Sequence, residues 1–271
     1  GMIGSTDAHT GLPSAREDNN FGKAHIVEPS ASRLGEPLIK APNPELSLLV
    51  KDLGAAGLAG VWAEENTREA IWDALARREV FATTGSRISV RLFGGWDFSE
   101  QQVNDPLWHH IGESQGVPMG GDLPERPSSS VAPSFMVAAS RDAAGANLDR
   151  IQIIKGWVDK RGERHERIFD VAVSDNRLIG PDGRCHTPVG STVDLSIPSF
   201  DNSIGAAQLS AFWRDPDFDP AQNAFYYARV LEIPKPRWSA YDVVRFGAVL
   251  PPDTASTVQD RAYTSPIWYS P

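Results

Sequence analysis

From about residue 85 onward, apolar residues recur at every second position, which is the spacing of strands with one buried face. The alternation is clearest over residues 225–231, where odd-numbered positions fall on one side of the strand and even-numbered positions on the other. We therefore predict a β-sandwich over residues 85–271, with a helix inserted near residues 104–115. The same alternation recurs, between clusters of Gly, Pro and Asp, at residues 88–93, 135–137, 151–153, 169–173, 193–195 and 209–211.

The opening part of the chain, residues 1–84, has a mixed pattern. Apolar residues at helical spacing predict a helix over residues 67–78, with Asn66 and Glu69 as its N-terminal cap pair. A shorter helix is predicted over residues 44–53, because Pro44 suits a first turn and Gly54 a stop. The other segments are predicted as strands at 58–63 and 80–82, a long surface segment at 12–44, a flexible loop at 127–133, and a last strand within 261–271 that ties the sandwich to the opening part.

Composition narrows the classes of function. Hydrophobic residues make up 41% of the 271 residues, enough for a real core. The net charge of −9 argues against a nucleic-acid groove or an anionic membrane surface as the main partner. The single cysteine, Cys185, cannot form an intrachain disulfide, so the chain fits a cytoplasmic or a periplasmic location equally well. No apolar run reaches the ~20 residues that cross a bilayer.

The first residues, G-M-I-G-S-T-D-A-H-T-G, carry the strongest candidate chemistry. Ile3 is predicted to end a buried strand, so that Asp7 and His9 leave its end and lean into one cleft. A carboxylate oxygen and a neutral imidazole suit zinc, manganese or iron. The alternative is a local turn in which Asp7 bonds nearby backbone. The chain has no H-x-H motif, and its other histidines are scattered: His25, His109, His110, His165 and His186.

The chain also resembles a known family over nearly its whole length. The matching stretches include G-V-W-A-E-E-N-T-R-E-A-I-W-D-A-L, A-T-T-G-S-R-I, G-V-P-M-G-G-D-L, W-R-D-P-D-F-D-P and R-A-Y-T-S-P-I-W-Y-S-P. These resemble family 3604 of the domains of unknown function, and I-G-S-T-D-A-H-T-G resembles the last metal-binding strand of PHP-type phosphoesterases. The resemblance implies that this chain is the C-terminal part of a PHP-like hydrolase.

That resemblance sets the expectations for fold and function. It implies an α+β protein in which residues 1–84 are the remnant of a PHP-like α/β barrel with two helices, followed by the sandwich. It assigns Asp7 and His9 as metal ligands and implies metal-dependent hydrolysis of a phosphoester or a related ester or amide. Because a catalytic metal needs about three protein ligands, we expect this fragment alone to be inactive. The alternative is a non-catalytic β-rich binding or structural module.

Three further side chains are weaker candidates for chemistry. Glu64 precedes the predicted helix and suits a general base or a partner of a metal ligand, although an acid at a helix start also complements the helix dipole. Arg68 and Arg87 suit a phosphate or carboxylate, or a structural ion pair. A small-molecule substrate is the expected partner. Surface that faced the rest of a barrel would be apolar, so we also expect self-association.

Overall fold

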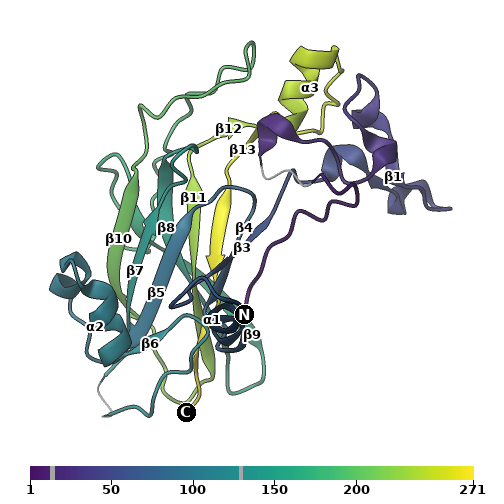
Figure 1. Ribbon diagram of the computed structural model, residues 1–271. Coiled ribbons are helices and arrows are strands. Elements are labelled where there is room, and N and C mark those ends of the chain that lie inside the picture. Colours follow the sequence, from purple (N-terminus) through teal and green to yellow (C-terminus); the bar gives the residue numbers. More distant parts are fainter. Residues whose placement is uncertain (13–15, 128–130) are drawn as a thin grey trace.

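Two antiparallel β-sheets packed face to face form the larger part of the molecule (Figure 1). The computed structural model describes residues 1–12, 16–127 and 131–271. One sheet has seven strands in the order β3-β4-β14-β11-β8-β9, with β15 also paired to β11, and the other has the order β10-β7-β5-β6. Their bounds are β3 Leu58–Val61, β4 Val80–Thr83, β5 Ser89–Gly95, β6 Val117–Pro118, β7 Ser134–Ser140, β8 Leu148–Val158, β9 Arg164–Val173, β10 Gln208–Arg214, β11 Ala224–Glu232, β14 Arg261–Thr264 and β15 Ile267–Tyr269.

The alternation of the sequence decides which side chains fill the space between the sheets. In β11 the even-numbered residues are buried and the odd-numbered ones half-buried, as the pattern predicts. The protein is therefore a β-rich α+β fold. Large apolar side chains from both sheets form one continuous core, among them Leu92, Phe135, Ile151, Ile153, Tyr226, Val230 and Ile267.

The end of the chain holds the seven-stranded sheet together. β14 lies between β4 and β11, with Ala262 opposite both Thr83 and Val230. The aromatic run at the C-terminus thus packs as two short strands and joins the sandwich to earlier residues, as predicted. Residues 58–83, which we assigned to the opening part, supply β3 and β4 to this same sheet.

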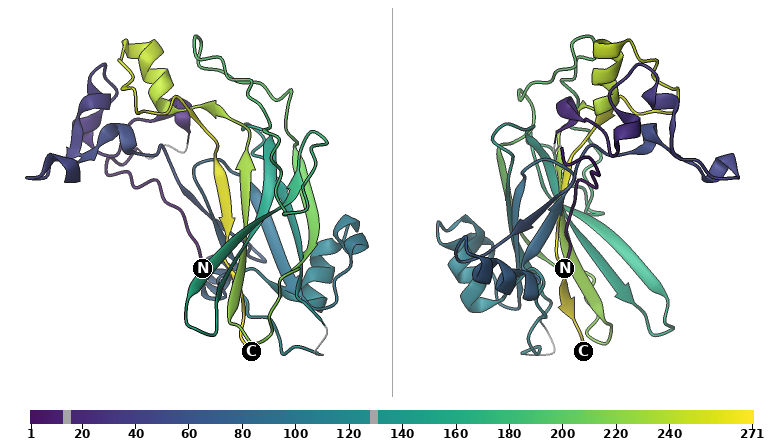
Figure 2. Two further views of the ribbon diagram at one scale, coloured as in Figure 1. Left: turned by 180° about the vertical axis from the view of Figure 1, so that it is seen from behind. Right: turned by 45° about the vertical axis from the view of Figure 1, so that its right-hand side comes forward.

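A small lobe stands beyond one end of the sandwich strands (Figure 2). We use this name for residues 16–57 together with 237–258. Its core contains Val27, Leu34, Val50, Trp238 and Ala248. The prediction of a surface segment over 12–44 is therefore wrong for its buried residues. The elements of the lobe and its connection are the 3₁₀ turns η1 Glu17–Asn19, η2 His25–Val27, η3 Arg33–Gly35, η4 Pro44–Leu46 and η5 Val50–Asp52, the hairpin β1 Pro37–Ile39 and β2 Leu48–Leu49, the pair β12 Lys235–Pro236 and β13 Thr257–Val258, and helix α3 Trp238–Phe246.

Helix α1, Arg68–Ala76, matches the predicted helix, but its cap differs. Thr67 occupies the N-cap and its side chain accepts a hydrogen bond from the backbone N–H of Ala70, a role we gave to Asn66. The helix predicted over 44–53 is wrong, because two 3₁₀ turns and strand β2 occupy those residues. The strand predicted at 193–195 is also wrong, since only an isolated bridge forms there.

Helix α2, Trp108–Gln115, and the 3₁₀ turn η6, Glu100–Asn104, cover part of the outer face of the four-stranded sheet. α2 lies within residues 104–115, where an inserted helix was predicted, whereas η6 precedes that range. Gly112 allows α2 to approach closely, because a Cβ there would come within 2.4 Å of the Phe93 ring. Phe93, Phe98 and Met136 form a second small core beneath the helix.

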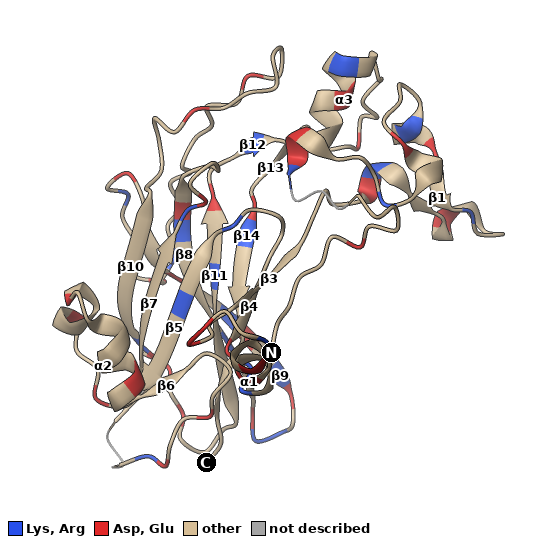
Figure 3. Ribbon diagram, in the orientation of Figure 1, with Lys and Arg blue, Asp and Glu red and all other residues tan. Residues whose placement is uncertain are grey.

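Acidic and basic residues are interspersed over both the sandwich and the small lobe (Figure 3). In the described part of the chain, no helix is both long and apolar enough to span a bilayer.

Part of the predicted loop at 127–133, and part of the predicted surface segment at 12–44, lie outside the described residues.

Candidate metal centre

The D-x-H turn, Asp7–His9, is held against the sandwich by the segment that precedes it. Gly4 packs so closely that a Cβ would come within 2.5 Å of the carbonyl oxygen of Leu58, and a Cβ on Gly57 would come within 2.4 Å of that of Ser5. Only glycines permit such an approach of two backbones. The turn therefore projects from an anchored segment rather than from a loose terminus.

The predicted buried strand before the turn is absent. Residues 1–8 form no strand in the structure, and the side chain of Ile3 is 67% exposed. The physical reason is that this segment contacts β3 and β4 without forming a ladder of backbone hydrogen bonds with either.

The structure brings Asp7 and His9 together at the surface. The Oδ1 atom of Asp7 lies 3.2 Å from Nε2 of His9, and the two side chains are 75% and 71% exposed, respectively. Asp7 has a φ of +53°, in the left-handed region that costs a non-glycine residue about 1 kcal/mol. The backbone N–H of His9 donates to the carbonyl of Lys23 at 2.7 Å. The turn thus presents both side chains to solvent from one side.

This geometry fits two neighbouring ligands of one metal ion. With metal–ligand distances of about 2.0–2.2 Å, two ligand atoms at tetrahedral or octahedral angles lie roughly 2.9–3.4 Å apart. The observed separation of 3.2 Å falls within that range. The chemistry of the pair, one carboxylate and one imidazole, suits zinc, manganese or iron.

Two other His–Asp pairs provide a comparison. His165 lies 3.1 Å from Asp159, and His186 lies 2.8 Å from Asp182. Asp159 and Glu163, together with His165, also form the one group of three metal-capable side chains found in the described residues. Distance alone therefore does not single out the D-x-H turn.

Backbone contacts distinguish these carboxylates. Asp159 accepts hydrogen bonds from the N–H groups of Arg161 and Glu163, and Asp182 accepts one from that of Arg184. Both acids therefore stabilise tight turns. The hydrogen bond to the histidine side chain lowers the pKa of each acid most, and the backbone N–H groups lower it further. Within the described chain, the carboxylate of Asp7 accepts no backbone hydrogen bond and contacts only His9. Its remaining lone pairs face solvent.

Lys23 is a neighbour of the turn that the sequence analysis missed. Its ammonium group contacts the carbonyl oxygen of Thr6, and the residue is buried. Burial lowers the pKa of Lys23, while the nearby charges of Asp7 and Glu17 raise it in part. The sequence gives no signal for this contact, because Lys23 lies in a segment without periodicity.

The weaker candidates do not join the turn. Glu64 is exposed before α1, and Arg68 is exposed at the first position of that helix. The backbone N–H of Arg87 donates to the carboxylate of Asp142 at 2.9 Å. None of the three forms a hydrogen bond or an ion pair with the D-x-H turn among the contacts of the described residues.

A buried polar cluster joins the sandwich to the small lobe. Lys235 lies 2.6 Å from Asp260 and 3.1 Å from Glu232. Burial alone would lower the pKa of Lys235, but the two carboxylates outweigh this effect and raise it. Nearby, burial raises the pKa of Glu17 to about 7, although the backbone N–H of Trp238 donates to this carboxylate at 2.6 Å. The sequence gives no signal for this cluster, because Glu17, Lys235 and Asp260 are far apart in the chain.

Comparison with known proteins places the whole chain in one family. Neither a curated protein nor a solved structure matches it. The model of the family described as "Protein of unknown function (DUF3604)" matches residues 1–271. The chain therefore belongs to the DUF3604 family.

Proposed function

We propose that Asp7 and His9 are two ligands of a catalytic divalent metal ion, and that this chain is the C-terminal part of a PHP-like metal-dependent hydrolase. In this proposal, the segment that carries the D-x-H turn continues into a barrel whose other metal ligands lie outside this chain. The supporting observation is the 3.2 Å separation of a carboxylate and an imidazole on an anchored turn. Among the three His–Asp pairs, Asp7 is also the acid whose carboxylate accepts no backbone hydrogen bond in the described chain.

The expected reaction is hydrolysis of a phosphoester or a related ester or amide. A bound zinc, manganese or iron ion would lower the pKa of a bound water to about 7 and so supply the nucleophile. The contribution of this chain is to hold Asp7 and His9 on a fixed backbone, with the positive charge of Lys23 beside them. Two ligands fall short of the three that a catalytic metal usually has, so this chain alone should show no turnover.

Metal binding by the untagged chain tests the assignment. We expect elemental analysis after dialysis against Zn²⁺, Mn²⁺ or Fe²⁺ to detect bound metal that is lost in the Asp7→Ala/His9→Ala variant. Asp182→Ala/His186→Ala is the matched control, since it removes another exposed His–Asp pair of similar separation. Asp159→Ala/His165→Ala tests the other candidate cluster.

Each outcome assigns the site. Loss of metal only in the Asp7→Ala/His9→Ala variant supports the proposal, whereas loss only in the Asp159→Ala/His165→Ala variant moves the site to the β8–β9 hairpin. If the parent chain binds no metal, the longer form that carries the further ligands decides: metal retained there by the Asp7→Ala/His9→Ala variant would overturn the proposal and favour the alternative of a non-catalytic β-rich module. In a longer form that carries the further ligands, Asp7→Ala should slow hydrolysis of p-nitrophenyl phosphate esters by more than the roughly 10–100-fold typical of residues that only support a ligand.

The same proposal predicts an apolar surface toward the rest of the protein. Phe225 contacts Trp268 with ring centroids 5.2 Å apart on the outer face of the seven-stranded sheet, and Trp268 is 42% exposed. We expect this patch to promote self-association of the isolated chain. Light scattering that shows a monomer at high concentration would contradict this expectation.

A further inference from the structure

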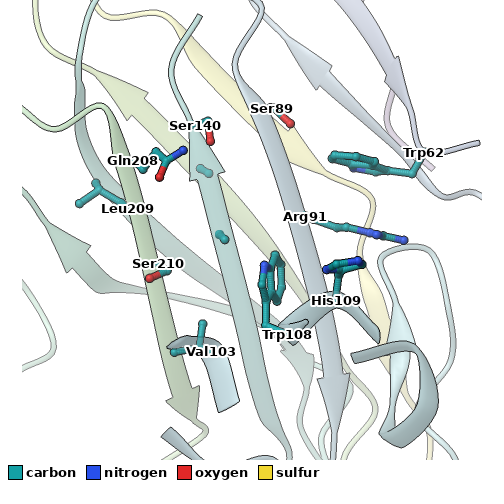
Figure 4. A pocket seen from close by; sticks show the side chains of 12 residues that line it. Trp62, Ser89, Arg91, Val103, Trp108, His109, Ser140, Gln208, Leu209 and Ser210 are labelled. Atoms are coloured by element: carbon teal, nitrogen blue, oxygen red, sulfur yellow. The ribbon is translucent and has the colours of Figure 1, made fainter. Parts of the chain in front are cut away.

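The outer face of the four-stranded sheet is covered over only part of its length. Three successive rows of side chains cross β5, β7 and β10 on this face. α2 and η6 cover the first row, and the other two rows line a cavity of about 730 Å³ (Figure 4). The rows are, in order, Phe93, Met136 and Phe212; Arg91, Ala138 and Ser210; and Ser89, Ser140 and Gln208. This volume lies in the range of small-molecule sites.

The floor of this cavity carries polar groups without partners. The side chains of Ser89, Ser140, Gln208 and Ser210 form no hydrogen bond with any other residue in the described ranges. Three hydroxyl groups and one amide therefore remain free to donate to and accept from a ligand. Their spacing is fixed by the register of three paired strands rather than by a loop.

Aromatic side chains form the walls. Trp62 is held by a hydrogen bond from its indole N–H to the carbonyl of Val90 at 2.9 Å. Trp108 packs edge-on against Phe93, with ring centroids 5.5 Å apart, where the covered part of the face ends. Trp108 and His109 extend from α2 beside the floor. Trp62 lies beside the guanidinium end of the Arg91 side chain, away from β5 (Figure 4).

The charged groups beside the cavity are paired with one another. One terminal nitrogen of Arg91 donates to Glu79 at 3.1 Å and to Glu113 at 2.7 Å. Glu79 also lies 3.5 Å from Arg77, so two guanidinium groups face two carboxylates and leave no surplus positive charge to bind an anion. The guanidinium carbon of Arg91 also lies 5.0 Å from the Trp62 ring and 4.9 Å from the Phe93 ring. Arg91 therefore already forms cation–π contacts with both rings.

We propose that this cavity binds a neutral carbohydrate. A sugar ring offers hydroxyl groups to the unpaired polar floor and apolar C–H groups to the indole side chains of Trp62 and Trp108, which line the cavity. It also brings no net charge to a cavity whose own charges are already paired. This proposal does not depend on the metal site, since none of the residues that line the cavity belongs to the D-x-H turn.

A glycan array of neutral and acidic oligosaccharides, followed by isothermal titration calorimetry of the strongest hit, tests the proposal. We expect binding of a neutral oligosaccharide that Trp62→Ala weakens at least about tenfold, as for a central aromatic contact. Gln208→Ala should also weaken it. Ser210→Trp should abolish it by filling the cavity from an exposed position, without removing a packed side chain.

Matched variants separate lost contacts from lost folding. Trp72→Ala removes a tryptophan that is 69% exposed on α1, and Gln101→Ala removes an exposed glutamine on η6; both should bind like the parent. Thermal unfolding should be unchanged in Gln208→Ala. The proposal is overturned if no neutral glycan binds, if acidic glycans or choline bind instead, or if Trp268→Ala abolishes binding while Ser210→Trp leaves it intact.

Discussion

Replacing Arg33 by alanine should unfold the small lobe while the sandwich stays folded. The side chain of Arg33 forms a two-pronged ion pair with Asp242 of α3, at 2.5 and 2.8 Å, and the two side chains are only 2% and 4% exposed. The guanidinium also donates to the carbonyls of Asn20 and Phe21 and stacks 4.7 Å over Trp238. Arg33 therefore links α3 to the irregular segment that surrounds it.

The expected cost follows from burial. Removing one partner of a buried ion pair leaves an uncompensated charge and costs about 3–5 kcal/mol. This amount is large for a lobe whose core contains few fully buried apolar side chains. A loss of that size raises the open population of the lobe by about 10²-fold or more, since about 1.4 kcal/mol corresponds to a factor of ten.

Native-state hydrogen exchange read by mass spectrometry measures this effect. In the Arg33→Ala variant, peptides from 16–57 and 238–250 should exchange about 10²-fold faster, while peptides from β7, β8 and β9 keep their protection. Arg16→Ala is the control within the lobe, because the Arg16–Asp18 pair is at the surface and worth at most about 1 kcal/mol. The double variant Arg33→Met/Asp242→Leu should regain much of the stability.

Two results would refute the reasoning. Unchanged exchange in the Arg33→Ala variant would mean that the ion pair is not what holds the lobe together. An equal rise in the exchange rates of lobe and sandwich peptides would mean that the lobe and the sandwich unfold as one unit.

Three other changes give measurable outcomes. Because burial raises the pKa of Glu17 to about 7 from 4.5, the folded state binds more protons than the unfolded state between these values, so stability should fall as pH rises through this window. The loss is at most about 3 kcal/mol, at about 1.36 kcal/mol per pKa unit, and urea unfolding at pH 5 and pH 8 should show it in the parent but not in Glu17→Gln. Tyr226→Phe removes a 2.7 Å hydrogen bond to the buried carboxylate of Asp215, and urea unfolding should show a loss of about 1–2 kcal/mol; no loss would contradict a net contribution from this bond. Gly4→Ala should displace the D-x-H turn and abolish metal binding while changing the stability of the sandwich by less than about 1 kcal/mol, and retained binding would show that the close packing of this segment is not needed.

The parts of the fold that could be predicted are those set by local pattern. Alternation along residues 225–231 correctly divides β11 into two faces, because a strand has a period of two regardless of its partners. The helix after Thr67 is likewise visible from its apolar spacing. The helix predicted at residues 44–53 fails because contacts with α3 far along the chain decide the structure of this segment.

The two candidate sites also differ in how much of each could be predicted from the sequence. Asp7 and His9 are close in sequence, so their proximity could be inferred from spacing alone. The cavity on the four-stranded sheet could not, because Ser89, Ser140 and Gln208 become neighbours only through the pairing of three strands. No pattern in a single strand shows which of its polar residues will lie beside those of another.

The position of β14 has a consequence for how the protein reaches its native state. This strand contains residues 261–264, yet it separates β4 from β11 in the finished sheet. During synthesis the chain cannot close the seven-stranded sheet until residues 261–264 have left the ribosome. Until then the facing edges of β4 and β11 remain unpaired, and such edges are templates for aggregation. Folding of this sheet should therefore be slow, completed only after β14 has been synthesised, and aided by chaperones that shield these two edges.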